Sequence, residues 1–242
     1  MKRILLMVFR NILLVPYMWI KLCHRAAHPE NYTLEEHVKF LKWIVFRANK
    51  GGNVKIEEHG ANLPKENGFM FFPNHQGMYD VLAILDACPY PFSVVAKKEV
   101  KDVPFLKQVF SCMHAYMIDR EDIRQSMQVI IDVSKEVQNG KNYLIFAEGT
   151  RSKNGNQIGS FKGGSFKAAT KAKCPIVPVA LIDSFKPFDT KTISQVTVQV
   201  HFLEPLYYEE YKNMKTTEIA EIVHDRIQKI IDKNCPERAE IQ

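Results

Sequence analysis

Apolar and polar residues follow two rhythms along most of the chain. Short runs with strand-like character cover residues 54–58, 69–73, 92–96, 115–118, 143–147, 176–181 and 196–202. Between them, apolar residues recur at the three- and four-residue spacing of helices over 79–87, 123–138, 164–172 and 216–233. This alternation predicts an α/β fold with a mostly parallel central sheet flanked by helices.

The amino-terminal stretch is different, because residues 4–22 are almost continuously apolar with Arg10 near the middle. On a single helix, Arg3, Arg10 and Lys21 would fall on nearly one line. A basic line beside an apolar face is typical of a helix that lies in a membrane interface next to anionic head groups. A membrane-spanning helix remains an alternative because the stretch is long enough, although a central Arg costs the insertion of such a helix roughly 2.5–3.5 kcal/mol. A cleaved signal peptide also stays open, without a clear cleavage site to support it.

A second amino-terminal helix is indicated by Thr33 and Glu36, which match a capping box. Its apolar surface is wider than a normal stripe because it carries three additional aromatic residues, Phe40, Trp43 and Phe46. It is either a buried core helix or a second membrane-contacting helix that forms a hairpin with the first. Gly51-Gly52 then breaks the chain. We therefore expect a membrane-associating helical hairpin over residues 1–50 and an α/β domain over 51–242.

Composition and charge suit a globular protein with an anionic partner. Of the 242 residues, 46% are hydrophobic and 25% charged, with a formal net charge of +6. A phosphorylated metabolite, an acidic membrane or nucleic acid would all fit this charge, but no nucleic-acid-binding module is recognisable. The five cysteines are scattered and form no C-x-x-C pair. This pattern disfavours a disulfide framework and a zinc site, and it favours a location facing a reducing cytosol.

The first cluster of reactive side chains follows the strand 69–73. His75 lies in the turn after it, and Asp80 lies in the first turn of the helix 79–87. The carboxylate can accept the imidazole Nδ1–H, which leaves Nε2 free as a general base. Without a nucleophilic Ser or Cys, such a base activates a hydroxyl of a substrate or of water. Alternatively, Asp80 only caps the helix and His75 is a surface residue; no second His or Cys stands at metal-ligand spacing.

The second cluster, Glu148-Gly149-Thr150-Arg151, follows the strand 143–147. Gly149 permits a tight turn, and the planar donors of Arg151 match a phosphate group. An ordinary turn with a surface arginine is the alternative. The P-loop pattern is not matched, which disfavours nucleotide hydrolysis.

These clusters resemble motifs of the glycerolipid acyltransferase family. The run from Asn74 to Asp80 is similar to its first motif, with Gly77 where the family often has Ser. The run Phe-Ala-Glu-Gly-Thr-Arg-Ser over 146–152 is similar to its third motif, with an Ala where Pro is usual. Segments 96–120 and 174–179 look like the second and fourth motifs, and the resemblance spans roughly residues 68–180. Within the second, Lys97 is the expected additional phosphate contact, unless it and Lys98 are simply a solvated pair.

The resemblance implies a glycerol-3-phosphate acyltransferase-like fold and a phospholipid-synthesising enzyme. It would move a fatty acyl group from acyl-CoA or acyl carrier protein to the free sn-2 hydroxyl of 1-acylglycerol 3-phosphate (lysophosphatidic acid), giving phosphatidic acid. The resemblance implies that the enzyme needs no cofactor and no metal. The expected partners are the lysolipid, the thioester carrier and membrane lipids, and nucleic acid is not among them. The catalytic residues would be His75 and Asp80. The substrate-binding residues would be Lys97, Glu148, Gly149, Thr150 and Arg151.

Several alternatives and details stay open on the sequence. Instead of 1-acylglycerol 3-phosphate, the acyl acceptor could be glycerol 3-phosphate, another lysophospholipid or a lyso-amino-lipid. The alternative classes of protein are a hydrolase and a non-enzymatic membrane-surface protein. Glu148 is expected to orient the acceptor or Arg151, and backbone amides near Gly77 or Gly149 are the candidates for an oxyanion hole. We expect a peripheral or monotopic enzyme, held on the cytoplasmic face of the cell membrane by its amino-terminal helices.

Overall fold

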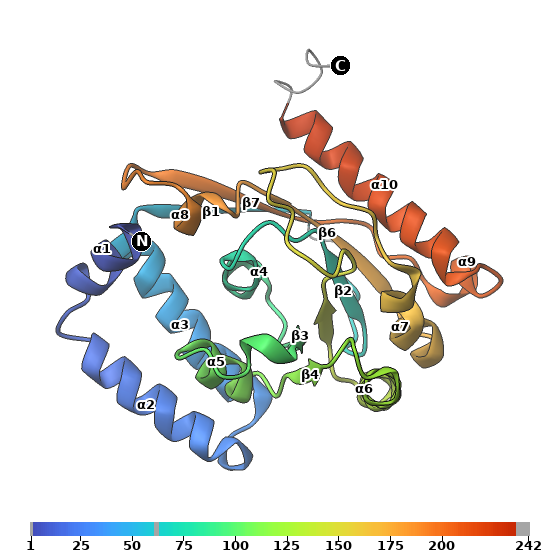
Figure 1. Cartoon of the computed structure of the whole chain (residues 1–242), viewed down its shortest axis with the longest axis horizontal. Helices are drawn as coiled ribbons and strands as arrows, with labels where there is room; N and C mark the ends of the chain where they lie inside the picture. Colours follow the sequence, from blue (N-terminus) through green and yellow to red (C-terminus); the bar gives the residue numbers. More distant parts are fainter. Residues whose placement is uncertain (1, 61–62, 236–242) are drawn as a thin grey trace.

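A seven-stranded sheet forms the centre of the molecule (Figure 1). The structure, a computed structural model, describes residues 2–60 and 63–235. The strand order is β1-β7-β6-β2-β5-β3-β4, and the paired strands run parallel except β6 and β7, which are antiparallel. The strands are β1 (Val54–His59), β2 (Met70–Pro73), β3 (Ser93–Lys97), β4 (Tyr116–Ile118), β5 (Tyr143–Ile145), β6 (Ile176–Ile182) and β7 (Val196–Phe202). The mostly parallel sheet expected from the sequence is confirmed.

Helices cover both faces of this sheet (Figure 1). Those associated with one core cluster are α1 (Lys2–Arg10), α2 (Val15–Ala27), α3 (Leu34–Gly52), α4 (Asp80–Ala87) and α5 (Leu106–Cys112). Those associated with the other are α6 (Ile123–Gln138), α7 (Lys167–Ala172) and α10 (Thr216–Asn234). The short elements are α8 (Lys186–Asp189), α9 (Tyr208–Tyr211) and the 3₁₀ turns η1 (Pro29–Asn31), η2 (Lys98–Val100) and η3 (Gly163–Phe166).

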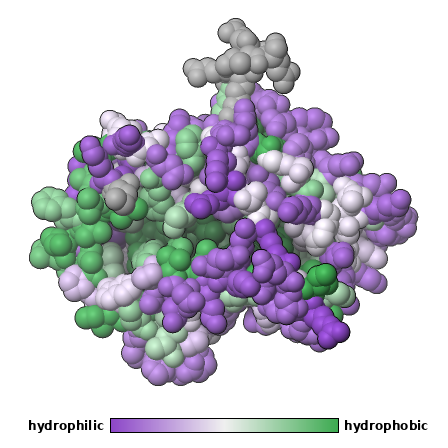
Figure 2. All heavy atoms as spheres, viewed as in Figure 1, coloured by the Kyte–Doolittle hydropathy of each residue, from purple (hydrophilic) through white to green (hydrophobic). Residues whose placement is uncertain are grey.

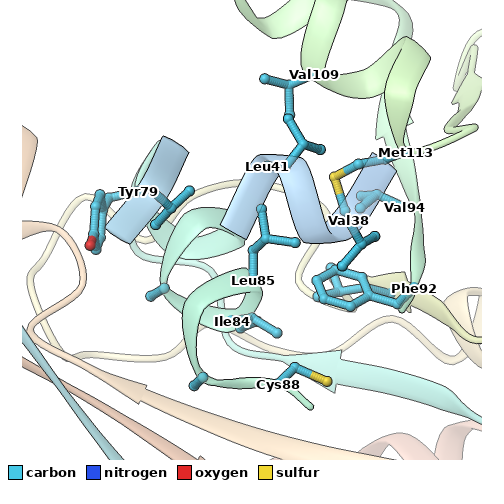
Figure 3. Packing of buried hydrophobic residues seen from close by; sticks show 14 of the residues in the cluster. Val38, Leu41, Tyr79, Ile84, Leu85, Cys88, Phe92, Val94, Val109 and Met113 are labelled. Atoms are coloured by element: carbon cyan, nitrogen blue, oxygen red, sulfur yellow. The ribbon is translucent and has the colours of Figure 1, made fainter. Parts of the chain in front are cut away.

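The central strand β2 shows why the sheet is buried on both sides. Successive side chains of a strand point to opposite faces. Phe69 and Phe71 join the core cluster beside α3 and α4, whereas Met70 and Phe72 join the cluster beside α6, α7 and α10. All four are 0% exposed. Figure 3 shows the first cluster, with residues of α3 and α5 packed around residues of α4 and β3. This double burial fixes the strand ends from which the candidate site is built.

All seven expected strands are present, with ends within two residues of the expected ones. The four expected helices of the α/β region are present too, although the one over 164–172 begins as the 3₁₀ turn η3. The helix α5 was not foreseen. The capping box is confirmed: the Thr33 amide donates to Glu36 Oε2 at 2.8 Å, and the Glu36 amide donates to Thr33 Oγ1 at 3.2 Å.

The first apolar stretch does not form one helix. The structure breaks it between Arg10 and Val15, and α1 and α2 meet at a bend of 100°. Among the described residues, no single helix is long and apolar enough to cross a membrane. Only this bent pair, with its two helices taken together, has the length and apolar composition of a membrane span. The prediction that Arg3, Arg10 and Lys21 lie on one line of a single helix is therefore wrong.

The two arginines of α1 bond to the protein backbone, Arg3 from a buried position and Arg10 from an exposed one. Arg3 is fully buried, and its Nη1 donates to the carbonyl of Gly52 at 2.6 Å while Nη2 donates to that of Thr192 at 3.0 Å. Arg10 Nη1 donates to the carbonyl of Gly51 at 3.2 Å. Carbonyls at a helix carboxyl end lack helical partners and carry partial negative charge, so cations stabilise them. Both arginines thus bind α1 to the end of α3.

Gly51 and Gly52 were expected to break the chain after the second helix, but α3 includes both, and Asn53, whose φ is 55°, caps its carboxyl end. Their small size serves helix packing. A Cβ on Gly51 would overlap the Asn11 side chain, and one on Gly52 would overlap Met7. The glycines let α1 approach α3 closely enough for its arginines to reach the carbonyls.

The amino-terminal helices present a large apolar surface. Figure 2 shows apolar side chains gathered on the side of the molecule where α1 and α2 lie in Figure 1. Phe9 is 75% exposed and Leu13 is 91% exposed. The other exposed apolar residues of α1, α2, their bend and α3 are Ile4, Leu5, Val8, Ile12, Tyr17, Trp19, Ile20 and Phe46. Contiguous surfaces of this kind mark contact with a membrane or another protein.

Candidate active site

His75 and Asp80 form a hydrogen-bonded pair at the carboxyl end of β2. His75 Nδ1 lies 2.7 Å from Asp80 Oδ2. The His75 side chain is 22% exposed, whereas that of Asp80 is fully buried. The Asp80 carboxylate accepts the Nδ1–H, which leaves Nε2 as the basic nitrogen. No hydrogen bond joins Nε2 to a Ser, Thr or Cys within residues 2–60 and 63–235, so the pair has a base without a protein nucleophile.

Three further donors surround the Asp80 carboxylate. The amide of Gln76 donates to Oδ2 at 2.6 Å, the amide of Gly77 lies 3.0 Å from both oxygens, and the Ser184 hydroxyl donates to Oδ1 at 2.6 Å. Asp80 thus does cap the turn before α4, but it holds the imidazole at the same time. An immobile Asp80 carboxylate can fix the tautomer of His75 and stabilise the imidazolium that forms when Nε2 takes a proton.

The aromatic ring of Phe146 supports the imidazole from one side. The two rings stack with centroids 3.9 Å apart and an angle of 21° between their planes. Phe146 immediately follows β5, the neighbour of β2 in the sheet. The stacked ring limits rotation of His75, which complements the hydrogen bond to Asp80.

Glu148 connects the second cluster to the first. Its Oε1 accepts the backbone amide of His75 at 2.7 Å, and its Oε2 accepts the amide of Gly159 at 2.9 Å. The side chain is 4% exposed, and burial raises the pKa of this carboxyl. No hydrogen bond or ion pair joins Glu148 to Arg151 among the described residues, so the expected contact with Arg151 is not seen, and a role in orienting the acceptor stays a prediction. Glu148 instead fixes the backbone on which His75 stands.

The turn after β5 gives His75 a second backbone contact, since the Ser152 amide donates to the His75 carbonyl at 2.7 Å. Within this turn, Gly149 has φ 73°, a left-handed conformation that glycine adopts without a steric penalty. The Gly149 carbonyl accepts a short hydrogen bond from Arg120 Nη1. The two motifs, more than 60 residues apart, therefore form one unit because β2 and β5 are adjacent.

The amides proposed for an oxyanion hole are already engaged. The Gly77 amide donates to Asp80, and the Gly149 amide donates to the Phe146 carbonyl at 3.2 Å. A donor that is committed to the protein cannot also stabilise a developing oxyanion without losing its first partner. The positions expected from the sequence are therefore wrong for this role.

Lys97, Thr150 and Arg151 are placed at the same edge of the sheet as His75. Lys97 ends β3, which pairs with β5, and Arg151 follows β5 in the turn. Neither cation has a hydrogen bond or an ion pair within the described part of the chain. Lys98, in contrast, is paired with Asp119 at 2.7 Å. Thr150 and Arg151 are exposed and Lys97 is half-buried, so the two unpaired cations can receive an anionic group from outside.

Sequence reasoning missed Ser184 and the role of Gln76. Gln76 is buried, and its Oε1 accepts the amide of Ser184 at 2.9 Å. Ser184 follows β6, which pairs with β2. Nothing in the sequence near residue 184 signals this contact, because it depends on the order of the strands. Within the described ranges, no group of three or more His, Cys, Asp or Glu side chains is placed so that it could bind a metal ion.

The model of the acyltransferase family matches residues 55–182, which is more than half of the chain and includes both clusters. The chain belongs to the acyltransferase family. It is similar to the 1-acyl-sn-glycerol-3-phosphate acyltransferase of Salmonella typhimurium, with 30% identity over 184 residues, or 74% of each chain. It is 27% identical to the Helicobacter pylori protein of the same description over 181 residues, 69% of this chain and 76% of the relative.

A solved structure supports the fold of this acyltransferase over almost its whole length. It is the crystal structure of the 1-acyl-sn-glycerophosphate (LPA) acyltransferase PlsC from Thermotoga maritima. The TM-score is 0.71 at 21% sequence identity, and the match covers 96% of this chain and 95% of that one. The acyltransferase therefore shares the arrangement of sheet, flanking helices and amino-terminal helices with that protein.

Proposed function

We propose that the enzyme transfers a fatty acyl group from an acyl thioester to the sn-2 hydroxyl of 1-acylglycerol 3-phosphate and so forms phosphatidic acid. The observation that carries this proposal is the His75–Asp80 pair, at 2.7 Å, with no nucleophilic side chain bonded to Nε2 in the part of the chain that the structure describes. The nucleophile must then come from the substrate. The unpaired cations Lys97 and Arg151 at the same sheet edge suit a phosphate on that substrate, and relatives with the corresponding activity support the choice of acceptor.

The reaction follows from this arrangement. Arg151 and Lys97 bind the acceptor phosphate, which places the free hydroxyl near His75 Nε2. His75 takes the hydroxyl proton while the oxygen attacks the thioester carbonyl, forming a tetrahedral oxyanion. The carbon–sulfur bond then breaks, and the imidazolium returns its proton to the leaving thiolate. The products are the new ester and a free thiol, and no acyl-enzyme forms.

The apolar surface of α1 and α2 suits a monotopic position on the cytoplasmic face of the membrane. We assign residues 1–50 to this attachment and residues 51–242 to the acyltransferase domain. A water-insoluble acceptor and its acyl chain would then reach the catalytic edge from the bilayer. The free cysteines among the described residues fit a reducing compartment.

An acceptor and donor screen tests the proposal. The purified enzyme is supplied with labelled acyl-CoA or acyl carrier protein thioester, and separately with 1-acylglycerol 3-phosphate, glycerol 3-phosphate, lysophosphatidylcholine, a lyso-amino-lipid or no acceptor. We expect labelled phosphatidic acid with 1-acylglycerol 3-phosphate, and the productive thioester identifies the donor.

His75→Ala is the control in that screen, and we expect a loss of about 10²- to 10⁴-fold in turnover, the typical worth of a general base. Unchanged turnover in this variant would remove His75 as the base. Another acylated acceptor would replace the proposed one, and acyl release without an acceptor would assign a hydrolase.

A further inference from the structure

A basic pocket lies at the bend between α1 and α2, apart from the catalytic residues. It has a volume of about 370 Å³ and is lined by Arg10, Asn11, Arg47, Lys50 and Gly51. Three of these five residues are cations, and none carries a carboxylate. Cations gathered in this way repel one another, and an anion bound among them relieves that repulsion. The pocket therefore has the electrostatic character of an anion site.

Two of the three cations are held in place. Arg10 Nη1 donates to Asn53 Oδ1 at 2.7 Å, and Arg47 Nε lies 3.3 Å from Asn11 Oδ1. Asn11 is itself fixed, because its Nδ2 donates to the carbonyls of Met7 at 2.8 Å and Arg47 at 3.1 Å. These bonds use only one guanidinium nitrogen of each arginine. The other nitrogens and the Lys50 ammonium have no partner among the described residues, so they are available to an anion.

An apolar rim next to the pocket indicates where the anion comes from. Phe9, Ile12 and Leu13 are 75%, 56% and 91% exposed around the bend, and Phe46, beside Arg47 on α3, is 55% exposed. Figure 2 shows apolar side chains gathered on the side of the molecule where α1 and α2 lie in Figure 1. Exposed apolar side chains beside unpaired cations are the arrangement of a surface that inserts between lipids and binds their head groups. A phosphate free in solution would gain nothing from such a rim.

We propose that Arg10, Arg47 and Lys50 bind the phosphate of an anionic membrane lipid, an inference that rests on the proposed membrane attachment. The neighbouring surface between α2 and α3 carries residues suited to the head-group level of a membrane. There a groove of about 460 Å³ separates α2 from α3 and is lined by Tyr17, Lys21, Arg25, Glu36, Lys39, Phe40 and Trp43. Tyrosine, tryptophan and lysine are the residues that occupy the head-group level of membranes. The bend thus inserts, and the pocket beside it selects negatively charged lipids.

Vesicle sedimentation of the full-length enzyme tests this site. The vesicles are pure phosphatidylcholine or a 4:1 mixture of phosphatidylcholine and phosphatidylglycerol, at constant ionic strength. The test variant is Arg47→Gln/Lys50→Gln, which leaves Arg10 and its structural bonds intact. The control is Lys229→Gln/Lys233→Gln, which removes the same charge from two exposed positions of α10. Turnover on a water-soluble short-chain acceptor shows that all variants are folded.

We expect the wild-type enzyme to bind the mixed vesicles more tightly than the neutral ones. Each cation near an anionic surface contributes roughly a fivefold factor, so the test variant should lose roughly 25-fold in affinity for mixed vesicles. The control should stay within about twofold, and binding to neutral vesicles should be unchanged. Equal losses in both double variants would mean that only total charge matters, and this would overturn the site.

Two other outcomes also overturn it, and they separate the site from the membrane attachment itself. Equal wild-type binding to both vesicle types would remove the anionic site but keep the insertion of the helices. No binding to either vesicle would remove the attachment. Calorimetric titration with inorganic phosphate, without lipid, tests whether the pocket binds a phosphate that is free in solution. Saturable binding in the submillimolar range that disappears in the test variant would assign the pocket to such a soluble phosphate.

Discussion

Ser184 and Asp80 lie 104 residues apart in the chain, yet the Ser184 hydroxyl donates a 2.6 Å hydrogen bond to Asp80 Oδ1. Both side chains are 0% exposed. The bond holds the carboxylate so that Oδ2 faces His75 Nδ1 at 2.7 Å. Ser184 is therefore a positioning residue, acting on the imidazole through Asp80.

Replacing Ser184 by Ala should lower kcat roughly 10- to 100-fold with little change in KM, in line with the loss of a hydrogen bond to a carboxylate that positions the base. Ser184→Thr, which keeps the hydroxyl, should restore most of kcat. A fall in kcat that the Thr variant does not recover, or an equal change in KM, would reduce the role of Ser184 to packing.

Glu148→Gln tests whether this residue fixes the backbone of His75. The carboxylate serves two amides, whereas a glutamine offers one acceptor oxygen and turns an NH₂ group toward the other amide. We expect the free energy of unfolding to fall by about 1–3 kcal/mol and turnover to fall at least tenfold. Urea unfolding and steady-state kinetics on the same preparation measure both. Glu221→Gln on the exposed face of α10 is the control, and wild-type stability in Glu148→Gln would contradict the assignment.

Arg151→Ala should raise KM for the phosphate-bearing acceptor by about 10- to 100-fold with little change in kcat, because a charge-assisted pair is lost while the base remains. Arg151→Lys should recover part of the loss, since lysine keeps the charge but not the forked geometry. Lys153→Ala, an exposed cation in the same loop, is the matched control. A fall in kcat at constant KM would place Arg151 elsewhere in the mechanism.

His201 should make the stability of the protein depend on pH. Burial, together with the neighbouring His59, lowers the pKa of His201 from 6.5 to about 4. As pH falls below 6.5, the unfolded chain takes up a proton at this position before the folded chain does. Stability is therefore lost between pH 6.5 and about 4, by about 1–3 kcal/mol, and no further below that range.

The measurement is urea unfolding across this pH range. His201→Gln should lose less stability on acidification than the wild-type protein, whereas His28→Gln, at an exposed position, should follow the wild-type profile. Identical slopes for wild type and His201→Gln would show that other groups cause the acid sensitivity.

The local chemistry of the site was readable from the sequence because it depends on short-range geometry. His75 and Asp80 are five residues apart across one strand-to-helix turn, and such a turn can bring the two side chains into contact, as the structure shows. Gly149 likewise indicated a tight turn, and its φ of 73° agrees. The strands were predictable since β2 is buried on both faces and reads as a continuous apolar run.

The contacts of Glu148 and Ser184 were not readable, because they arise between strands that are neighbours only in the sheet. The order β6-β2-β5 brings residues 75, 148 and 184 together, and no local pattern specifies that order. The same holds at the amino terminus. Periodicity placed the arginines of α1 on one line toward lipid, but the free carbonyls at the end of α3 bind them from the protein side.

Most elements of the α/β region, the reactive pair and the family resemblance could be predicted from the amino-acid sequence, since each is encoded within a few consecutive residues. The tertiary structure alone decided which groups remain available for function. Glu148 and the amides of Gly77 and Gly149 make internal hydrogen bonds, while Arg151, Lys97 and Lys50 stay unpaired among the described residues. A polar group can satisfy only a limited number of partners, and strand order and helix packing determine which of them come within its reach.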